Sequence, residues 1–361
     1  MSEAEETRGE PLALSEPNST NSNPAPVRTN VDFDGDLVLV VGAEVDEVEQ
    51  EFLVCSTTLR RVSLVWKKML FGCFMERKPA QGEWVVTLPE DKAAPLLVLL
   101  NIIHAWFGAV PRDPSLSQIY EIMVLAHKYD MTRVVRPWAE DWLRAAAVKQ
   151  DLKKGPDIVK LTHVAWEFGD EQLFHKMANR LAFSCYVDEA GYLTLIKGLR
   201  LDEYDHLGPD NLLDCIKDWR SKSIQETLRS VHQVTKSLMD DTQKHHCNDR
   251  KGCAYMLLGS LWTGIMKIRG SLLPETEDEI LESVTDLVTC VRNALAQVRG
   301  FGFTIEGEKF NDSRYVLAAI CLSHNSLSST GVLDQARLKE QRLKLGLPEN
   351  LDHLRTITAN P

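Results

Sequence analysis

The sequence predicts an α+β N-terminal domain, with a small sheet and packed helices, followed by a mainly α-helical C-terminal region. Three short apolar stretches have the length and residue types of buried strands, at 37–41, 50–54 and 83–88. Beyond residue 90, apolar residues recur three and four positions apart, which is the spacing of one helix face. Strands followed by a run of helices are typical of an α+β layer.

Apolar periodicity and capping residues predict the helices. A helix over 56–70 separates the second and third strands, and Ser56 or Thr57 can serve as its N-cap. Ser115 and Gln118 have the spacing of a capping box, in which each side chain bonds the backbone N–H of the other residue. Further helices are expected over residues 90–110, 115–130, 132–148, 157–183, 211–239, 253–268, 277–298 and 333–349.

Two of these segments carry more specific signals. Within 157–183, Gly169 can end one helix in the left-handed conformation and Asp170 can cap the next, which predicts a helical hairpin. Trp138 and Trp142 lie four residues apart, so their side chains are expected on the same helix face. Both signals indicate packing between neighbouring helices.

Composition divides the chain into four segments. Residues 1–33 are rich in Pro, Asn, Ser, Thr and Glu, have few large apolar groups, and are expected to form a disordered tail. The α+β domain covers 34–148. The stretch Lys-Lys-Gly-Pro at 153–156 marks a boundary, after which we expect a helical region over 155–240 and a C-terminal helical region over 241–361.

Charge and cysteine content narrow the class of protein. The net charge of −11 in 361 residues argues against nucleic-acid binding, which needs a concentrated basic face. The longest apolar runs are shorter than the roughly 20 residues that span a bilayer, so no membrane span is expected. Eight scattered Cys and a polar, acidic N-terminus favour reduced thiols in the cytoplasm or nucleus.

Signatures of catalysis are missing from the sequence. It contains no G-x-S-x-G elbow, no phosphate-binding G-x-x-x-x-G-K-[ST] loop and no G-x-G-x-x-G motif. His127 and His163 lie in helical patterns, where a hydrogen-bonded structural histidine is common. The pairs Arg60-Arg61 and Lys67-Lys68 suit a solvated helix face. We therefore expect a protein that is not an enzyme and needs no cofactor.

The stretch "HHCNDRKGC" has the residue types of a metal site, with His245, His246, Cys247 and Cys253. Imidazole and thiolate groups are the ligands of tetrahedral structural zinc. The spacing between the two cysteines is wider than in the usual zinc pair, and a polar loop between helices is the alternative interpretation. A zinc-stabilised helical structural or regulatory protein is thus an alternative function.

Four stretches follow one another in a recognisable order: "DGDLVLVVG" at 34–42, "FLVCSTTLRRVSLVWKKML" at 52–70, "VVTLPED" at 85–91 and "LAHKYDMTRVVRPWAEDWL" at 125–143. With strands and helices in this order, the segment from 33 to 147 resembles a BTB/POZ domain, particularly the divergent type common in fungal proteins. The helical hairpin after residue 155 is similar to the BACK extension that follows many such domains. The resemblance implies an interaction adaptor or scaffold, and not an enzyme.

The resemblance also implies a specific partner. Cullin-binding members carry a hydrophobic-x-Glu element after the helix that precedes the third strand, and Phe74, Met75 and Glu76 stand there in this sequence. An ordinary loop is the alternative interpretation of these three residues. Cys55 replaces the histidine that most members carry after the second strand. The family's dimerisation element has no counterpart in the polar tail, so a homodimer stays open.

Overall fold

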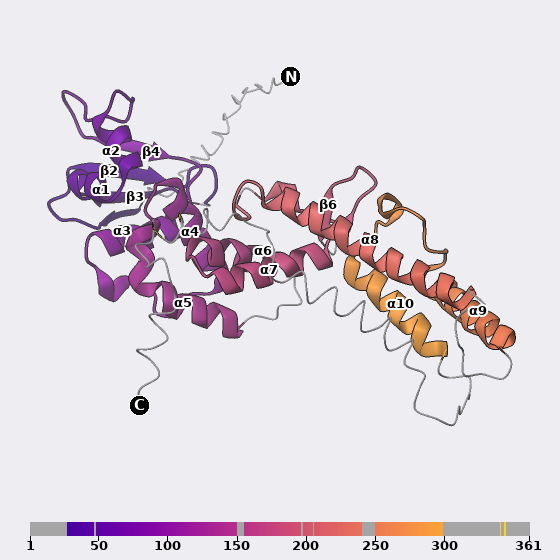
Figure 1. The fold of residues 1–361 in the computed structure, drawn as a ribbon. Coiled ribbons are helices and arrows are strands. Elements are labelled where there is room, and N and C mark those ends of the chain that lie inside the picture. Colours follow the sequence, from indigo (N-terminus) through magenta and orange to yellow (C-terminus); the bar gives the residue numbers. More distant parts are fainter. Residues whose placement is uncertain are drawn as a thin grey trace, which may run out of the picture. The chain divides into compact units, whose positions relative to one another are not determined.

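A computed structural model describes the chain in several ranges, and its described residues form two compact units. A sheet unit contains residues 27–55 and 79–93, and a helical unit contains 56–78 and the residues from 94 onward. The described ranges are 27–46, 48–149, 155–195, 198–204, 206–239 and 250–298, with residues 340 and 343. The expectation of a small N-terminal sheet followed by a mostly helical remainder is confirmed (Figure 1).

The sheet unit has four strands in the order β1-β3-β2-β4. The strands are β1 (Val27–Asn30), β2 (Leu37–Val41), β3 (Gln50–Val54) and β4 (Val85–Leu88). β2 and β3 are antiparallel, with Leu39 opposite Phe52, whereas β4 runs parallel to β2. Leu37, Val38 and Leu39 are all buried, so both faces of β2 are covered. This explains its continuous apolar sequence, because a strand buried on both faces has no polar alternation.

Strand β1 corrects the prediction of a disordered tail through residue 33. It pairs in parallel with β3, with Val27 opposite Gln50 and Asn30 opposite Leu53. Arg28 donates to Glu51 over 2.7 Å and to Glu83 over 3.1 Å. The segment has few apolar side chains because backbone hydrogen bonds to a neighbouring strand hold it, and such bonds leave no hydrophobic pattern in the sequence. Residues 1–26 lie outside the described residues.

The helical unit begins with two helices where the sequence predicts one. α1 spans Ser56–Val62 and α2 spans Leu64–Phe71, and the chain is extended at Ser63 between them, with φ −139° and ψ 131°. The Ser63 hydroxyl accepts a hydrogen bond from the backbone N–H of Trp66 at 3.0 Å and donates to the carbonyl of Tyr129. The prediction of one continuous helix is wrong because Ser63 caps a new helix and bonds a distant carbonyl.

Three helices and two 3-10 turns follow the sheet. They are α3 (Ala93–Ile103), η1 (Phe107–Ala109), α4 (Leu116–Lys128), η2 (Thr132–Val135) and α5 (Arg136–Lys149). The predicted capping box is confirmed, because Ser115 and Gln118 bond each other's backbone N–H at 2.8 and 3.3 Å. Trp138 and Trp142 contact each other, with ring centroids 6.4 Å apart, and the Trp142 indole donates to the carbonyl of Pro111 at 3.0 Å.

The next two helices form the predicted hairpin. α6 spans Gly155–Glu167 and α7 spans Glu171–Ser184. Gly169 has φ +66°, and the Asp170 carboxylate accepts from the backbone N–H of Leu173 at 2.9 Å. α6 packs against α4 as well as α7, and its residues from 161 to 167 are all buried. Contacts between α4 and α6 therefore cross the position of the predicted boundary near residue 155.

A second, smaller sheet follows α7 and is missing from the prediction. Its strands are β5 (Tyr186–Val187), β6 (Leu193–Leu195) and β7 (Leu199–Arg200), all antiparallel, and the 3-10 turn η3 (Leu201–Glu203) comes next. Strands of two or three residues are too short to show alternation in a sequence. The guanidinium of Arg200 in β7 lies over the ring of Tyr192, 3.4 Å from its centroid. This cation–π contact joins β7 to the residues just before β6.

Three helices follow, α8 (Leu212–Met239), α9 (Arg250–Arg269) and α10 (Val284–Val298). α9 and α10 pack along the C-terminal part of α8 (Figure 1). A helix from residue 277 is predicted, but Glu277–Glu279 form the 3-10 turn η4. α10 begins only after Ser283, whose hydroxyl accepts a hydrogen bond from the backbone N–H of Asp286. The helix predicted over 333–349 lies outside the described residues, apart from positions 340 and 343.

None of the helices in the described ranges combines the length and the apolar character that crossing a membrane requires.

Candidate partner-binding surface

Helix α2 is fixed along its inner side. Trp66 and Leu70 are buried, and the Trp66 ring stacks on Tyr129 with centroids 4.4 Å apart and planes inclined by 12°. Ser63 bonds the helix start and the Tyr129 carbonyl at the same time. The helix therefore has one orientation in the helical unit, and its opposite side faces solvent in that orientation.

The solvent side of α2 combines apolar and basic groups. Leu64, Lys67, Lys68 and Phe71 are all exposed. They stand at positions i, i+3, i+4 and i+7, which places them along one stripe of the helix. We call these four residues the α2 face. Two lysines lie at its centre and an apolar side chain lies at each end.

The chain leaves α2 at Gly72 through a turn that only glycine fits. The Gly72 N–H donates to the carbonyl of Lys68 at 2.9 Å, and a Cβ atom at Gly72 would lie 2.3 Å from that carbonyl oxygen. Such a distance is far inside van der Waals contact. Any side chain here would displace the following loop, residues 72–78, from its position.

The 72–78 loop holds the three residues that the sequence predicts for a partner. Phe74 is 57% exposed and Met75 is 99% exposed, whereas Glu76 is half-buried. The Phe74 carbonyl accepts from the backbone N–H of Arg77 at 3.3 Å, which closes a turn around Met75 and Glu76. The three residues do lie on a surface loop, and their binding to a cullin stays a prediction.

The same segment carries a strong positive charge. Residues 56–78 contain one acidic side chain, Glu76, in a chain whose net charge is −11. They contain six basic side chains, all exposed: Arg60, Arg61, Lys67, Lys68, Arg77 and Lys78. The exposure of Arg60, Arg61, Lys67 and Lys68 agrees with the predicted solvated helix face. The spacing of these residues is visible in the sequence, but which side of the helix faces solvent depends on the burial of Trp66 and Leu70 and on the bond from Ser63 to Tyr129.

The predicted zinc ligands cannot be placed. His245, His246 and Cys247 lie outside the described residues, and Cys253 is described only as part of the backbone of α9. Within the described ranges, no group of three or more His, Cys, Asp or Glu side chains is arranged to hold a metal ion. The zinc site and its alternative, a polar loop, both stay predictions.

A buried polar cluster between α4 and α6 is a feature that the sequence pattern did not indicate. Glu167 is 1% exposed, and its carboxylate lies 3.1 Å from Nδ1 of His127 and accepts from the Thr132 hydroxyl at 3.2 Å. His163, one helical turn before Glu167, is 2% exposed. Its ring lies between those of Tyr120 and His206, with centroids 5.3 and 5.6 Å away.

The protonation states in this cluster follow from burial. Burial lowers the pKa of His163 to about 4, against an opposing effect of Glu167, so the ring is neutral at pH 7. Neither ring nitrogen of His163 has a hydrogen-bond partner within the described residues, which corrects the expectation of a hydrogen-bonded histidine. Burial alone would raise the pKa of Glu167, but the hydrogen bond from His127 and the nearby His163 bring it below its usual value. The cluster links α4 to α6 through one buried carboxylate.

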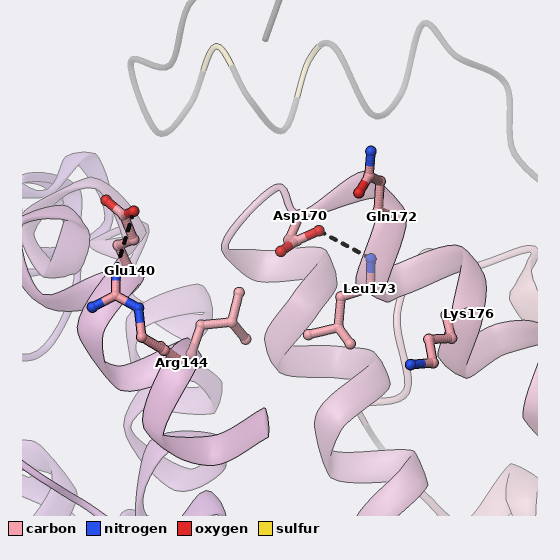
Figure 2. Close-up of a pocket in the computed structure, with 7 residues that line it drawn as sticks. Glu140, Arg144, Asp170, Gln172, Leu173 and Lys176 are labelled. Atoms are coloured by element: carbon pink, nitrogen blue, oxygen red, sulfur yellow. Dashed lines mark hydrogen bonds and ion pairs between the residues drawn. The ribbon is translucent and has the colours of Figure 1, made fainter. Parts of the chain in front are cut away.

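A cleft of the helical unit lies between α5 and α7, away from this cluster. Its volume is about 380 Å³. Figure 2 shows two interactions among the residues that line it: Arg144 with Glu140 at 3.4 Å, and Asp170 with the N–H of Leu173. The cleft is lined by Glu140, Leu143, Arg144, Asp170, Gln172, Leu173 and Lys176. Asp170 caps the start of α7 and Arg144 pairs along the surface of α5, and none of the lining residues is arranged as a nucleophile beside a base.

Comparison with known proteins adds no family. No protein-family model matches the sequence, and no curated protein matches it. The function is therefore inferred from the residues and geometry described above.

Proposed function

We propose that this protein is a non-enzymatic protein–protein interaction adaptor whose N-terminal part is a domain of the BTB/POZ type. In its specific form, it is a substrate adaptor for a cullin-type ubiquitin ligase. The observation that carries the proposal is the 72–78 loop, which exposes Phe74 and Met75 next to a helix held rigidly from the other side. Exposed aromatic and Met side chains in a fixed position are typical anchors of protein interfaces.

The order of elements supports this proposal. β2, β3, α1, α2, β4, α3, α4 and α5 follow one another along the chain in the order on which the BTB/POZ resemblance depends. The α6–α7 hairpin follows where the BACK extension is expected. This is support from fold analogy, which bears on function less directly than a site does.

The position of Glu76 supports the cullin form of the proposal. Phe74, Met75 and Glu76 lie in one turn closed by the Arg77 N–H, so an apolar group and a carboxylate are presented together. Phe74 can fill an apolar pocket of the partner, and Glu76 can accept hydrogen bonds at its rim. A residue that fills a central pocket of an interface contributes more binding free energy than the residues at the rim of that pocket.

Binding of the full chain to purified cullin N-terminal domains tests the proposal. Phe74→Ala should weaken binding at least about thirtyfold, the effect of losing about 2 kcal/mol at a central anchor. Glu76→Gln should weaken it less. Tyr255→Ala is the matched control, because Tyr255 is an aromatic residue of α9 that is 68% exposed. Unchanged binding of the Phe74 and Glu76 variants would show that the contact is wrong, and failure of the wild-type chain to bind any cullin would rule out the ligase form.

A further inference from the structure

We infer that the α2 face binds an acidic polypeptide segment in which carboxylates are flanked by apolar side chains. The inference rests on the proposed adaptor function and names the chemistry of a partner. It concerns Leu64, Lys67, Lys68 and Phe71, and not the cullin contact proposed for the 72–78 loop.

The geometry of the face sets the pattern of the partner. Leu64 and Phe71 are seven residues apart on α2, so their side chains lie about 10 Å apart along the helix axis. Lys67 and Lys68 project between them on the same stripe. A complementary segment therefore has apolar residues about two helical turns apart and acidic residues between them.

Other cations of the helical unit have acidic partners. Arg144 lies 3.0 Å from Asp141, and Arg200 lies 2.6 Å from Asp202. Within the described residues, no acidic side chain lies at ion-pair distance from Lys67 or Lys68. Positive charges near a helix C-terminus are favoured by the helix dipole, which accounts for Lys68 but not for Arg77 beyond the helix end.

The basic surroundings extend the attraction beyond the two lysines. Arg60 lies over the Phe71 ring, 4.8 Å from its centroid, so one end of the face is itself flanked by a cation. An acidic partner would be attracted to this surface in an otherwise acidic chain, which repels it elsewhere. The charge contrast therefore selects where on the chain such a partner binds.

A polypeptide fits this face better than a membrane surface does. Helices that bind membranes insert a broad apolar side into the lipid. The broad apolar side of α2, with Trp66 and Leu70, is buried in the protein, and lysines occupy the centre of its outward side. Separate carboxylates of a polypeptide can pair with each lysine while two apolar contacts form beside them.

Fluorescence anisotropy with a labelled synthetic peptide tests the inference on the full chain. The peptide has about 15 residues, or about four helical turns, with Leu and Phe about two turns apart and glutamates between and beyond them. We expect it to bind, and we expect affinity to fall about tenfold between about 50 and about 300 mM NaCl as the charges are screened. Lys67→Glu with Lys68→Glu should weaken binding at least about thirtyfold. Leu64→Ala with Phe71→Ala should weaken it about tenfold.

The matched control is Lys176→Glu with Lys222→Glu, which makes the same change of net charge at exposed lysines of α7 and α8. The control should bind like the wild type. The double variant Lys67→Gln with Lys68→Gln should show an intermediate affinity. Its circular dichroism spectrum distinguishes a loss of binding from a loss of folding. Equal weakening by the control pair, or no peptide binding at low salt, would overturn the inference.

In a second experiment, binding of the full chain to vesicles of phosphatidylserine and phosphatidylcholine is measured. Binding to these vesicles without binding to the peptide would assign the face to membranes and refute the inference. Failure of the cullin experiment with retained peptide binding would refute only the ligase form of the proposed function. Loss of peptide binding with retained cullin binding would refute only this inference.

Discussion

Two parts of the helical unit are built on different chemistry. Between α4 and α6, buried polar groups accompany the apolar core, with Thr132, His163 and Glu167 all buried. The bundle of α8, α9 and α10 has a continuous aliphatic core: Ile224, Leu228, Val231, Leu261, Ile265, Leu273, Ile280, Val284, Leu287, Val288, Val291 and Ala294 with Cys290. A polar core depends on hydrogen bonds and protonation, whereas an aliphatic core depends on volume and shape.

Arg220 is a buried charged residue of the bundle, and it bonds the backbone. Arg220 donates to the carbonyls of Ile280 and Glu282 at 2.8 and 2.6 Å and to that of Cys185 at 3.5 Å. It thus ties α8 to the segment that precedes α10 and to the end of α7. Burial lowers the pKa of Arg220, and burial raises the pKa of the neighbouring Cys185 thiol to about 12. We therefore expect that replacing Arg220 or changing side-chain volume destabilises the bundle. A fall in pH should instead destabilise the core between α4 and α6.

The largest expected effect is at Arg220. Arg220→Met keeps the buried stem but leaves three carbonyls without their donor, so the free energy of unfolding should fall by about 4 kcal/mol. Hydrogen exchange of the α10 amides measures the change locally. Arg229→Met, at an exposed arginine of the same helix, is the control and should change stability by less than about 0.5 kcal/mol. If the α10 amides are equally protected from exchange in Arg220→Met and Arg229→Met, Arg220 does not anchor the bundle.

The second prediction concerns pH. His163 has a pKa of about 4 in the folded chain and 6.5 as a free side chain, so the unfolded chain binds its proton first as pH falls. Its contribution to stability is full above pH 6.5 and is lost between pH 6.5 and about 4. The loss amounts to about 3 kcal/mol. Glu167, whose pKa is lowered, loses its contribution only as pH falls below its usual range.

His163→Phe tests the origin of this pH dependence. The variant keeps a ring between Tyr120 and His206 and removes two nitrogens that have no hydrogen-bond partner in the described structure. Its stability at pH 7 should stay within about 1 kcal/mol of wild type, and its loss between pH 6.5 and 4 should be much smaller. Urea denaturation across this range measures both. His232→Gln, at an exposed histidine of α8, should keep the wild-type profile.

A pair of glycines in α9 tests the role of volume in the bundle. A Cβ atom at Gly264 would lie 2.9 Å from the Cβ of Ala294 in α10, whereas at Gly259 it would meet nothing within 4 Å. Gly264→Ala should therefore destabilise the bundle by about 2 kcal/mol through overpacking. Gly259→Ala should stabilise it by up to about 1 kcal/mol because alanine favours a helix. The same sign for both variants would contradict the close approach of α9 and α10.

The smallest expected effect is at Thr132. Thr132→Val removes the hydroxyl that donates to Glu167 at 3.2 Å, while His127 still contacts that carboxylate. Stability should fall by about 1 kcal/mol, the contribution of one hydrogen bond to a charged group that keeps another partner. Thr162→Val is the comparison, since its hydroxyl donates to the Ile158 carbonyl within the same helix, α6. Thr132→Val should lower stability more than Thr162→Val in urea denaturation.

Part of the candidate surface could be predicted from the sequence. The pattern placed Phe74, Met75 and Glu76 in a loop after a helix, and the structure has them there, with Phe74 and Met75 exposed. It predicted one helix over 56–70, whereas the structure has two helices with a break at Ser63, and the side of α2 that faces solvent is set by contacts with distant residues. The break depends on a hydrogen bond from Ser63 to Tyr129, 66 positions along the chain.

The amino-acid sequence alone determined the features that depend on neighbouring residues. These are strands β2 and β3, the capping box at Ser115 and Gln118, and the turn between α6 and α7 at Gly169 and Asp170. Tertiary structure alone decided the pairing of β1 with β3, the start of α2 and the burial of Glu167 beside His127 and His163. Local features follow from backbone preferences within a few positions. The others arise from contacts between residues far apart in the chain, whose free energy no short stretch of sequence contains.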